Sequence, residues 1–282
     1  MSRVTLAIVT AVSSFLFLTL PAWAAEQMPT PSFPVPWQLG LQVPASPQAQ
    51  QLVDFHNFLM VIITAITVFV LILLLICIFR FNEKANPVPA KWSHNTPLEI
   101  IWTVIPVLIL VVIAVPSFKL LYYLDRTTEA EMTLKVTGNQ WFWSYEYTDS
   151  DVSFDALALP DDQIDVSKGQ HRLLETDNHV VLPLDTNIRI LFTANDVIHA
   201  WTIPAFGVKL DNMPGRINES WTRITVPGRY YGQCSELCGV DHSYMPIVVD
   251  AVSKEEYQKW LSEKKQANAG SAATTTQLAT AQ

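Results

Sequence analysis

The sequence is poor in charged residues. Asp, Glu, Lys and Arg make up 16% of its 282 residues, whereas about a quarter of the residues of a soluble domain are charged. Two apolar segments, 55–79 and 100–118, contain none of the four. At about 1.5 Å per residue, the shorter one just crosses a hydrocarbon layer of ~30 Å. These absences exclude an ordinary soluble protein. They predict two transmembrane helices, at about 55–81 and 98–121, which form a hairpin over residues 55–124.

The basic residues around this hairpin indicate its orientation. Arg80, Lys84 and Lys91 lie in the short loop between the two spans, and positively charged loops stay on the cytoplasmic side. Both ends of the mature chain are then external. Residues 1–24 are interpreted as a signal peptide, because a basic start, an apolar stretch and a small-x-small site follow one another; a first transmembrane helix is the alternative. Residues 25–54, rich in Pro and Gln, are expected to be irregular and exposed.

Helical periodicity is absent between residues 132 and 252. Short β-rich runs, broken by Gly, Pro, Asp and Asn, take its place. The runs are MTLKVTG, QWFWSYEYT, HRLLET, HVVLPL, NIRILFTA, AWTIPAF, WTRITV, GRYYGQ and PIVVDAV. Many strands without intervening helices predict an antiparallel sandwich or barrel, in a domain of residues 125–265. A short amphipathic helix follows Ser253 as its N-cap, and residues 266–282 form a low-complexity tail for which we expect no packed structure.

The negative charge of the chain is confined to this β-rich domain. Residues 125–265 hold 22 acidic and 13 basic side chains, a net charge of −9, and the rest of the chain nets +1. Such a domain favours a cationic partner and argues against nucleic acid.

Cysteine is scarce, and its distribution is uneven. Cys77 lies inside the first span, where a small apolar side chain serves packing. Cys234 and Cys238, the other two, share the stretch YGQCSELCGVDHSYMP (231–246) with a histidine and a methionine. The concentration of sulfur and imidazole in one loop between two strands marks it as the candidate site.

Several kinds of chemistry could use this loop. A disulfide suits an oxidising compartment but does not explain His242 and Met245 beside the thiols, and a thiol redox pair is a further possibility. Structural zinc is disfavoured because a thioether is a poor zinc ligand. Two thiolates, an imidazole and a thioether are soft donors suited to copper, and two thiolates could bridge two ions. His199, which begins a strand 35 residues before Cys234, is a candidate further ligand, with a buried structural histidine as the alternative.

Three segments together resemble a known family. They are GNQWFWSYEYTD (138–149), NDVIHAWTIPAFGVKLDNMPGR (195–216) and the C-x-E-x-C-x3-H-x2-M loop. Over nearly its whole length the sequence resembles subunit II of a bacterial haem–copper cytochrome c oxidase of the aa3 kind. The fold class implied is an α+β membrane protein, in which an N-terminal two-helix transmembrane hairpin precedes a cupredoxin-like antiparallel β-sandwich.

By this resemblance the loop holds a dinuclear copper A centre. The implied ligands are Cys234 and Cys238 as bridges, His199 and His242 as terminal ligands, and Met245 and the carbonyl of Glu236 as weak outer ligands. The carboxylate of Glu236 would face a magnesium or manganese ion at the contact with subunit I.

The resemblance also implies roles outside the loop. Trp141 is where electrons would enter beneath a docked cytochrome c, although an aromatic of the sandwich core is the simpler interpretation. Glu99 matches the mouth of a proton pathway, with a stabilising first-turn helix carboxylate as the alternative. The implied docking residues are Glu146, Asp155, Asp196 and Asp211. Asn139 and Asn195 depart from the family, which often has His and an acidic residue there, so weaker docking charge is expected.

The function implied is electron transfer by one subunit of an enzyme, cytochrome c oxidase. The chain would accept electrons from a reduced c-type cytochrome and pass them to haem a in subunit I, where oxygen is reduced to water and protons are pumped. It would lie in the bacterial inner membrane beside subunits I and III, with both mature termini and the copper domain in the periplasm. A quinol oxidase subunit would lack the copper ligands, a copper chaperone would need one span, and a purely structural subunit is the third alternative. No C-x-x-C-H motif occurs, which excludes a fused cytochrome c domain.

Overall fold

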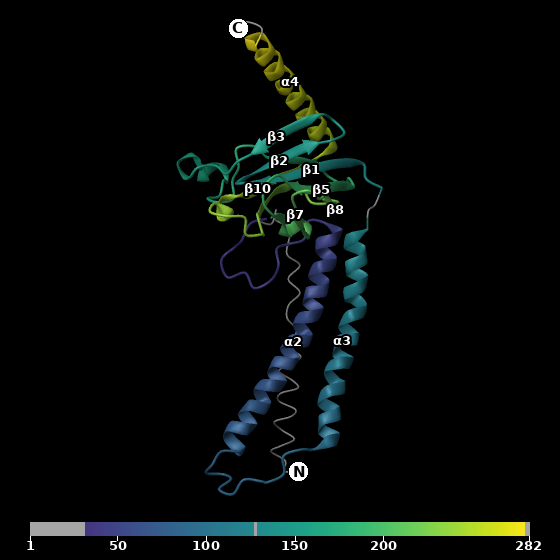
Figure 1. Cartoon of the computed structure of the whole chain (residues 1–282), viewed down its shortest axis with the longest axis vertical. Coiled ribbons are helices and arrows are strands. Elements are labelled where there is room, and N and C mark those ends of the chain that lie inside the picture. Colours follow the sequence, from purple (N-terminus) through teal and green to yellow (C-terminus); the bar gives the residue numbers. More distant parts are fainter. Residues whose placement is uncertain (1–31, 127–128, 280–282) are drawn as a thin grey trace. The chain divides into compact units, whose positions relative to one another are not determined.

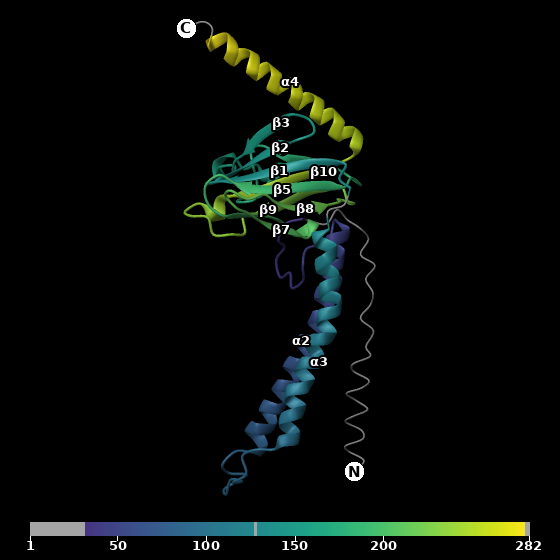
Figure 2. The same ribbon diagram turned by 45° about the vertical axis from the view of Figure 1, so that its right-hand side comes forward.

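Two long helices lie in the first half of the described chain. The computed structural model describes residues 32–126 and 129–279, so the predicted signal peptide, 1–24, lies outside the described residues. Helices α2 (Pro47–Arg80) and α3 (Thr96–Asp125) lie side by side in both views (Figures 1 and 2). Both are long and apolar enough to cross a membrane, as the charge-free segments predict.

Each of these helices begins at a polar cap followed by proline. The side chain of Ser46 accepts a hydrogen bond from the amide of Ala49 at 3.0 Å, and that of Asn95 accepts one from the amide of Leu98 at 3.2 Å. Caps of this kind satisfy amides that the first helical turn leaves free. Helix α2 therefore starts at Pro47, ahead of the predicted 55, because the hydropathy pattern marks only the apolar part of a longer helix.

The segment before α2 is attached to the β domain. Ala45, Ser46 and Gln48 are buried. The amide of Ala45 donates to the carbonyl of Ala205 at 2.8 Å, and the hydroxyl of Ser46 donates to the carbonyl of Phe206 at 2.7 Å. The expectation of an irregular, exposed segment is confirmed for residues 34–44, which are mostly exposed and lie in no helix or strand. It is wrong from Ala45 to residue 54, because these polar groups find acceptors on the β domain and α2 has already begun.

Within the residues that the structure describes, ten strands form the β domain. They are β1 (Met132–Asn139), β2 (Phe142–Tyr147), β3 (Val152–Ala156), β4 (Val180–Pro183), β5 (Ile188–Ala194), β6 (His199–Ile203), β7 (Val208–Asn212), β8 (Asn218–Thr222), β9 (Gly228–Gln233) and β10 (Pro246–Val252). The short 3-10 helices η1 (Asp161–Gln163), η2 (Val166–Lys168), η3 (Pro204–Phe206) and η4 (His242–Tyr244) lie in the connections, and α4 (Lys254–Ala279) follows the last strand. Figure 1 shows the strands as layered arrows.

The strands form three sheets. A five-stranded sheet has the order β3-β2-β1-β5-β8, a three-stranded sheet the order β4-β10-β9, and β6 pairs with β7. Most neighbours are antiparallel, but β1 and β5, and likewise β10 and β4, are parallel. The predicted order of two apolar helices followed by a β-sandwich is confirmed, with these parallel pairs as an addition.

The core lies between the sheets and follows the alternation of the strands. In β1, Leu134 and Val136 are fully buried, while the alternate residues Thr133, Lys135 and Thr137 are partly exposed. Ile190 and Phe192 of β5 are also fully buried, and β5 lies beside β1 in parallel register. Each such side chain contributes about 1.5–3 kcal/mol relative to exposure, so this rigid core fixes the strand ends that carry the site.

Some local predictions fail. The run HRLLET (171–176) forms turns and one isolated bridge instead of a strand, and strands β3 and β7 are absent from the predicted runs. The N-cap at Ser253 is confirmed, because its hydroxyl accepts from the amide of Glu256 at 3.2 Å while the Glu256 carboxylate accepts from the Ser253 amide at 3.1 Å. Helix α4 continues to Ala279, through most of the expected low-complexity tail.

Candidate metal centre

The candidate ligands come from one strand start and one loop. His199 is the first residue of β6, and Cys234 directly follows β9. The loop from Cys234 to Met245 joins β9 to its antiparallel neighbour β10. The amide of Cys234 donates to the carbonyl of Met245 at 3.0 Å, which closes the loop at its base. Residues eleven positions apart are thereby held together.

Within this loop the sulfur and nitrogen donors converge. The sulfur atoms of Cys234 and Cys238 lie 3.8 Å apart, and both cysteines are free thiols. The Nδ1 atom of His199 lies 4.0 Å from the sulfur of Cys234, and the Nδ1 atom of His242 lies 3.6 Å from that of Cys238. The carbonyl oxygen of Glu236 is 3.3 Å from the sulfur of Cys234. His199 and the two cysteines form a cluster that could hold a metal ion.

These donors are withdrawn from water. His199 is 0% exposed, and Cys234, Cys238 and Met245 are 6%, 3% and 1% exposed. His242 is half-buried. Buried, soft donors that face one another suit a copper site, because thiolates, imidazole and thioether all favour copper.

The two thiols do not ionise alike. Burial raises the pKa of Cys234, but hydrogen bonds with the His199 ring and the backbone of Ala200 outweigh it and lower that pKa to about 6. Burial and the negative charge of Cys234 raise the pKa of Cys238 to about 12. A bound cation would supply the positive charge that lets both thiols ionise, and the thiolate is the form that binds metal. The residues present therefore fit a metal that both sulfurs share.

Three neighbours fix the orientation of the His199 ring. Its Nε2 atom lies 2.8 Å from Oδ1 of Asp196, which leaves Nδ1 facing the sulfurs. Trp143 packs edge-on against the ring, with centroids 5.9 Å apart. A Cβ atom on Gly138 would lie 2.6 Å from Cδ2 of the ring. Sequence reasoning assigned none of these positioning roles, although the Asp-x-x-His spacing is a signal that could have suggested the first.

The turn between β1 and β2 is hydrogen-bonded to the loop that carries the candidate ligands, residues 234–245. The side chain of Gln140 and the indole Nε1 of Trp141 both donate to the carbonyl of Cys238, at 2.8 and 3.3 Å. The backbone amide of Gln140 donates to Asp196 at 2.7 Å. Gly239, with φ +127°, allows this packing, because a Cβ there would lie 3.0 Å from the Trp141 ring. Trp141, predicted from the sequence, is thus in direct contact with the loop, whereas the part played by Gln140 was missed.

The four predicted docking acids do not lie in one place. Glu146 and Asp155 lie on adjacent strands β2 and β3, on the same face of the five-stranded sheet, and both are exposed. Asp211 is exposed on β7, opposite Ala200. Asp196 differs, because its carboxylate accepts from Gln140 and pairs with His199. Burial raises the pKa of Asp196, but these bonds outweigh it and the pKa is lowered.

The remaining predicted residues are Glu99, in the first turn of α3, and Glu236, in the loop between β9 and β10. The carboxylate of Glu99, in the first turn of α3, accepts a hydrogen bond from the amide of Asn95 at 3.1 Å, which completes a reciprocal cap. The alternative interpretation of Glu99, as a first-turn carboxylate that stabilises the helix, is therefore supported. The carbonyl of Glu236 is turned toward the cluster while the residue itself is exposed.

Comparison with known proteins places this arrangement in a family. A model of the periplasmic domain of cytochrome c oxidase subunit II matches residues 132–252, and a model of the transmembrane domain of the same subunit matches residues 34–120. The chain belongs to the cytochrome c oxidase subunit II family. Membership makes it a subunit of an oxidase, and the resemblance stated from the sequence is confirmed.

Individual members of this family are similar to the chain over half of its length or more. A probable cytochrome c oxidase subunit 2 of Rickettsia bellii is 50% identical over 83% of this chain and 86% of its own length. The corresponding protein of Rickettsia prowazekii is 52% identical over 83% of this chain and 74% of its own. The crystal structure of the periplasmic domain of subunit II of cytochrome oxidase from Bradyrhizobium japonicum is 45% identical, covers 50% of this chain and 99% of that one, and has a TM-score of 0.47.

Proposed function

We propose that this subunit II relays electrons from a reduced c-type cytochrome to haem a of subunit I through a dinuclear copper A centre. Oxygen reduction to water and the coupled proton pumping would take place in subunit I. Membrane and periplasmic assignments follow the same proposal: two helices anchor the chain in the bacterial inner membrane, and both mature ends and the β-sandwich lie in the periplasm. Subunit III would complete the membrane partners.

The observation that carries the proposal is the convergence of two thiols, two imidazole Nδ1 atoms and a carbonyl on one buried point. Cys234 and Cys238 would bridge two metal ions, because their sulfur atoms are close enough to bind the same ions and are not joined in a disulfide. His199 and His242 would each approach from the side of one cysteine. Copper bound there would accept and release one electron at a time.

The protein's own residues would keep the centre rigid and dry. Asp196 holds the His199 ring through Nε2, and a fixed tautomer keeps Nδ1 available as ligand. Met245, 1% exposed, would complete the outer shell together with the carbonyl of Glu236. The exposed carboxylate of Glu236 would be free to hold a magnesium or manganese ion at the contact with subunit I.

Trp141 would connect the donor to this centre. It is half-buried, and its indole donates directly to the carbonyl of Cys238, so one hydrogen bond separates the ring from a ligand residue. The exposed acids of the β domain, Glu146, Asp155 and Asp211, would attract a cationic cytochrome. Asp196 would contribute less to docking than the resemblance implies, since it is already paired with His199.

Copper content and spectrum test the proposal. The full-length protein, loaded with copper, should bind two ions per chain and give the paramagnetic resonance spectrum of one unpaired electron shared between them, with near-infrared absorption. Cys234→Ser should abolish that spectrum, while Met245→Leu should retain two ions with an altered reduction potential. One ion per chain, or a normal spectrum in Cys234→Ser, would overturn the dinuclear assignment.

A further inference from the structure

A cavity lies between the two apolar helices at the end nearest the β-sandwich. It has a volume of about 680 Å³ and is lined by residues from the start of α2 and the end of α3. Phe55, Phe58, Pro116 and Leu120 form most of its apolar wall. The copper site does not use this cavity, and none of the residues assigned to electron transfer lines it.

The polar residues of the cavity lie at the level where the apolar segments end. Asp54 directly precedes the charge-free segment 55–79, and Lys119 directly follows the charge-free segment 100–118. Because α2 and α3 run in opposite directions, these two residues mark the same boundary of the hydrocarbon layer. The cavity therefore has an apolar half on the membrane side and a charged half on the side of the β-sandwich.

The charged half is mainly cationic. Lys119 lies near the end of α3 and Arg126 is the residue that directly follows this helix, and both line the cavity. Asp54 is the acidic residue of the described lining, and its carboxylate already accepts from Gln50 at 2.9 Å. The balance favours an anion between the two basic side chains.

Arg126 is held in place by aromatic rings. Its guanidinium carbon lies 4.4 Å from the ring centre of Tyr123 and 5.2 Å from that of Trp221 in β8. The two rings themselves make an edge-on contact at 5.7 Å. A guanidinium stacked in this way keeps its N–H donors free at the edges, which is the geometry that recognises a phosphate.

We propose that this cavity binds a glycerophospholipid, with its phosphate between Lys119 and Arg126 and an acyl chain along Phe55, Phe58 and Leu120. A lipid has the same division as the cavity, since its anionic group lies at the boundary and its chains extend into the hydrocarbon. Tyr122, also in the lining, would lie at headgroup depth, where aromatic residues are common.

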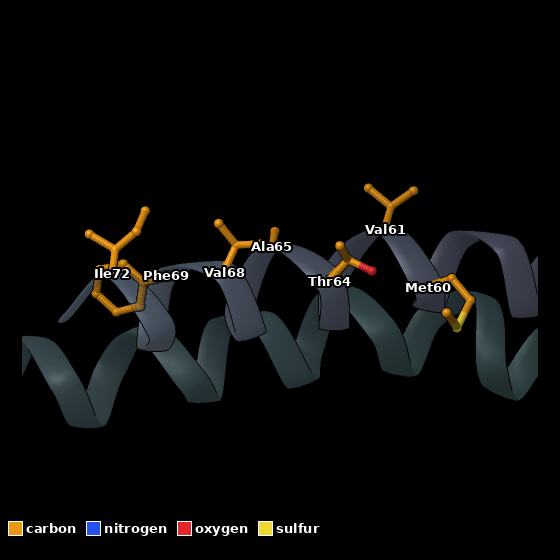
Figure 3. Close-up of a pocket in the computed structure, with 7 residues that line it drawn as sticks. All are labelled: Met60, Val61, Thr64, Ala65, Val68, Phe69 and Ile72. Atoms are coloured by element: carbon orange, nitrogen blue, oxygen red, sulfur yellow. The ribbon is translucent and has the colours of Figure 1, made fainter. Parts of the chain in front are cut away.

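A second hollow on α2 lacks these features. Its lining comes from α2 alone, and Figure 3 shows Val61, Val68 and Ile72 pointing away from the neighbouring helix. Thr64 is the polar residue of that described lining, so nothing there would select a phosphate. This surface would contact acyl chains without preference for a headgroup, and it serves as an internal comparison.

Photolabelling of the full-length protein in detergent tests the proposal. The probes are phosphatidylglycerol and phosphatidylethanolamine with a photoreactive acyl chain, and a diacylglycerol with the same chain but no phosphate. Both phospholipids should label peptides that contain Phe55, Phe58 or Leu120, and the diacylglycerol should label only the exposed face of α2. Lys119→Gln should reduce phospholipid labelling about fivefold, and a further Arg126→Gln by about the same factor.

The controls separate binding from folding and from general attraction. Lys119 is exposed, so its substitution leaves the fold intact, and Lys119→Arg should retain most of the labelling because it keeps the positive charge. Arg80→Gln removes one positive charge at the opposite end of α2 and should leave the labelling unchanged. Equal labelling by diacylglycerol, unchanged labelling in Lys119→Gln, or, in the assembled oxidase, crosslinking of the cavity to another subunit would each overturn the proposal.

Discussion

At the scale of single residues, His179 joins two parts of the sandwich through charge. Its Nε2 atom lies 2.7 Å from Glu175 and its Nδ1 atom 2.9 Å from Asp250. Arg229 pairs with Asp250 from the other side at 2.7 Å. Burial lowers the pKa of His179, but the bonds with Asp250 and Glu175 outweigh it and raise that pKa to about 9. The protonated ring thus neutralises the buried Glu175, which lies in the turn that replaces the predicted strand.

We expect the β-sandwich to lose stability as the pH rises past neutrality. The folded pKa of His179, about 9, exceeds the unfolded value of about 6.5, so its contribution is complete below pH 6.5 and disappears as the pH rises through 9. The loss is at most about 3 kcal/mol. Thermal unfolding of the full chain, followed by near-ultraviolet circular dichroism, should show this decline, and His179→Gln should flatten it. Substitution of the exposed His94 should leave the decline of stability with pH unchanged. An equal flattening in the His94 variant would contradict the assignment of this decline to His179.

Gly138 offers a second test at this scale. A methyl group on Gly138 would lie 2.6 Å from the His199 ring, closer than real contacts permit, so Gly138→Ala should displace the ring from the sulfurs. We expect a lower copper content and a perturbed resonance spectrum, with the β-sandwich still folded. Gly40→Ala is the matched control, because a Cβ at Gly40 meets nothing within 4 Å. Normal copper loading in Gly138→Ala would show that the ring is free to adjust.

At the scale of elements, strands β2 and β3 carry the exposed acids Glu146 and Asp155, and the turn before β2 carries Trp141. Glu146 pairs across strands with Lys135 at 2.9 Å, and Asp155 accepts from Ser144 at 2.6 Å. This sheet face presents carboxylates whose positions are partly fixed. Exposed carboxylates at the rim of an interface affect the rate of association more than the rate of dissociation.

Replacing an acid on this face should weaken cytochrome docking alone. Glu146→Gln should raise the Michaelis constant for a cationic cytochrome c and flatten its dependence on ionic strength, with electron transfer inside the bound complex unchanged. Glu219→Gln is the matched control, because Glu219 also forms an exposed cross-strand pair, with Arg189 of β5, elsewhere on the same sheet. Steady-state kinetics at several salt concentrations measures both. Equal responses of the two variants would refute a specific docking face.

Trp141 should act on the electron step instead. Trp141→Ala removes the ring that donates to the carbonyl of Cys238, so the bound complex should transfer electrons more slowly by orders of magnitude while cytochrome binding is retained. A flash-initiated measurement on the complex distinguishes the two steps. Trp92→Ala, which removes an exposed tryptophan of the loop between the helices, should leave the rate unchanged. Weaker binding with an intact bound-state rate would move the role to another ring.

The elements also show where sequence patterns stop being informative. The spacing of Cys234, Cys238 and His242 reveals the loop because its donors are close in sequence. The contact of Gln140 with Asp196 joins residues 56 positions apart, and no local pattern encodes it. Strands such as VSFDA and VKLDN escaped prediction because they are short and carry polar residues on one side.

Burial could also reverse a local prediction. HRLLET has the composition of a strand, yet the carboxylate of Glu175 turns inward to meet His179, and a buried charge requires that partner. The first eight residues of α2, 47–54, were missed because the hydropathy pattern marks only apolar residues. The first residues of this helix are polar, and only their hydrogen bonds with the β domain, such as that of Gln48 with Trp221 at 3.2 Å, reveal that they are ordered.

At the scale of the whole molecule, charge and apolar surface are separated along the chain. The β-rich domain has a net charge of −9, while the hairpin has charge-free segments. The attraction between this negative charge and a positively charged cytochrome should therefore steer the cytochrome toward the domain. The Debye length falls from about 30 Å at 0.01 M to ~8 Å at 0.15 M ionic strength, so association should slow as salt is added.

Glu99 tests the role of the membrane part in turnover. Its carboxylate caps α3 by accepting from the Asn95 amide, and an amide side chain can accept the same bond. If the carboxylate also takes up protons, Glu99→Gln should lower oxidase turnover as much as Glu99→Ala, at normal copper content and cytochrome affinity. Glu83→Gln, in the loop between the helices, is the control. Full turnover in Glu99→Gln with loss only in Glu99→Ala would limit the residue to capping, a contribution of about 0.3–1 kcal/mol.

The hydrogen bonds that join Ala45 and Ser46 to Ala205 and Phe206 have a mechanical consequence. They connect the first turn of α2 to η3, which directly follows the strand that His199 begins. A change in the tilt of α2, of the kind that a thinner or thicker bilayer imposes, would therefore be transmitted to that strand through these hydrogen bonds. We therefore expect the lipid environment to influence the position of His199, the candidate ligand, through this backbone connection.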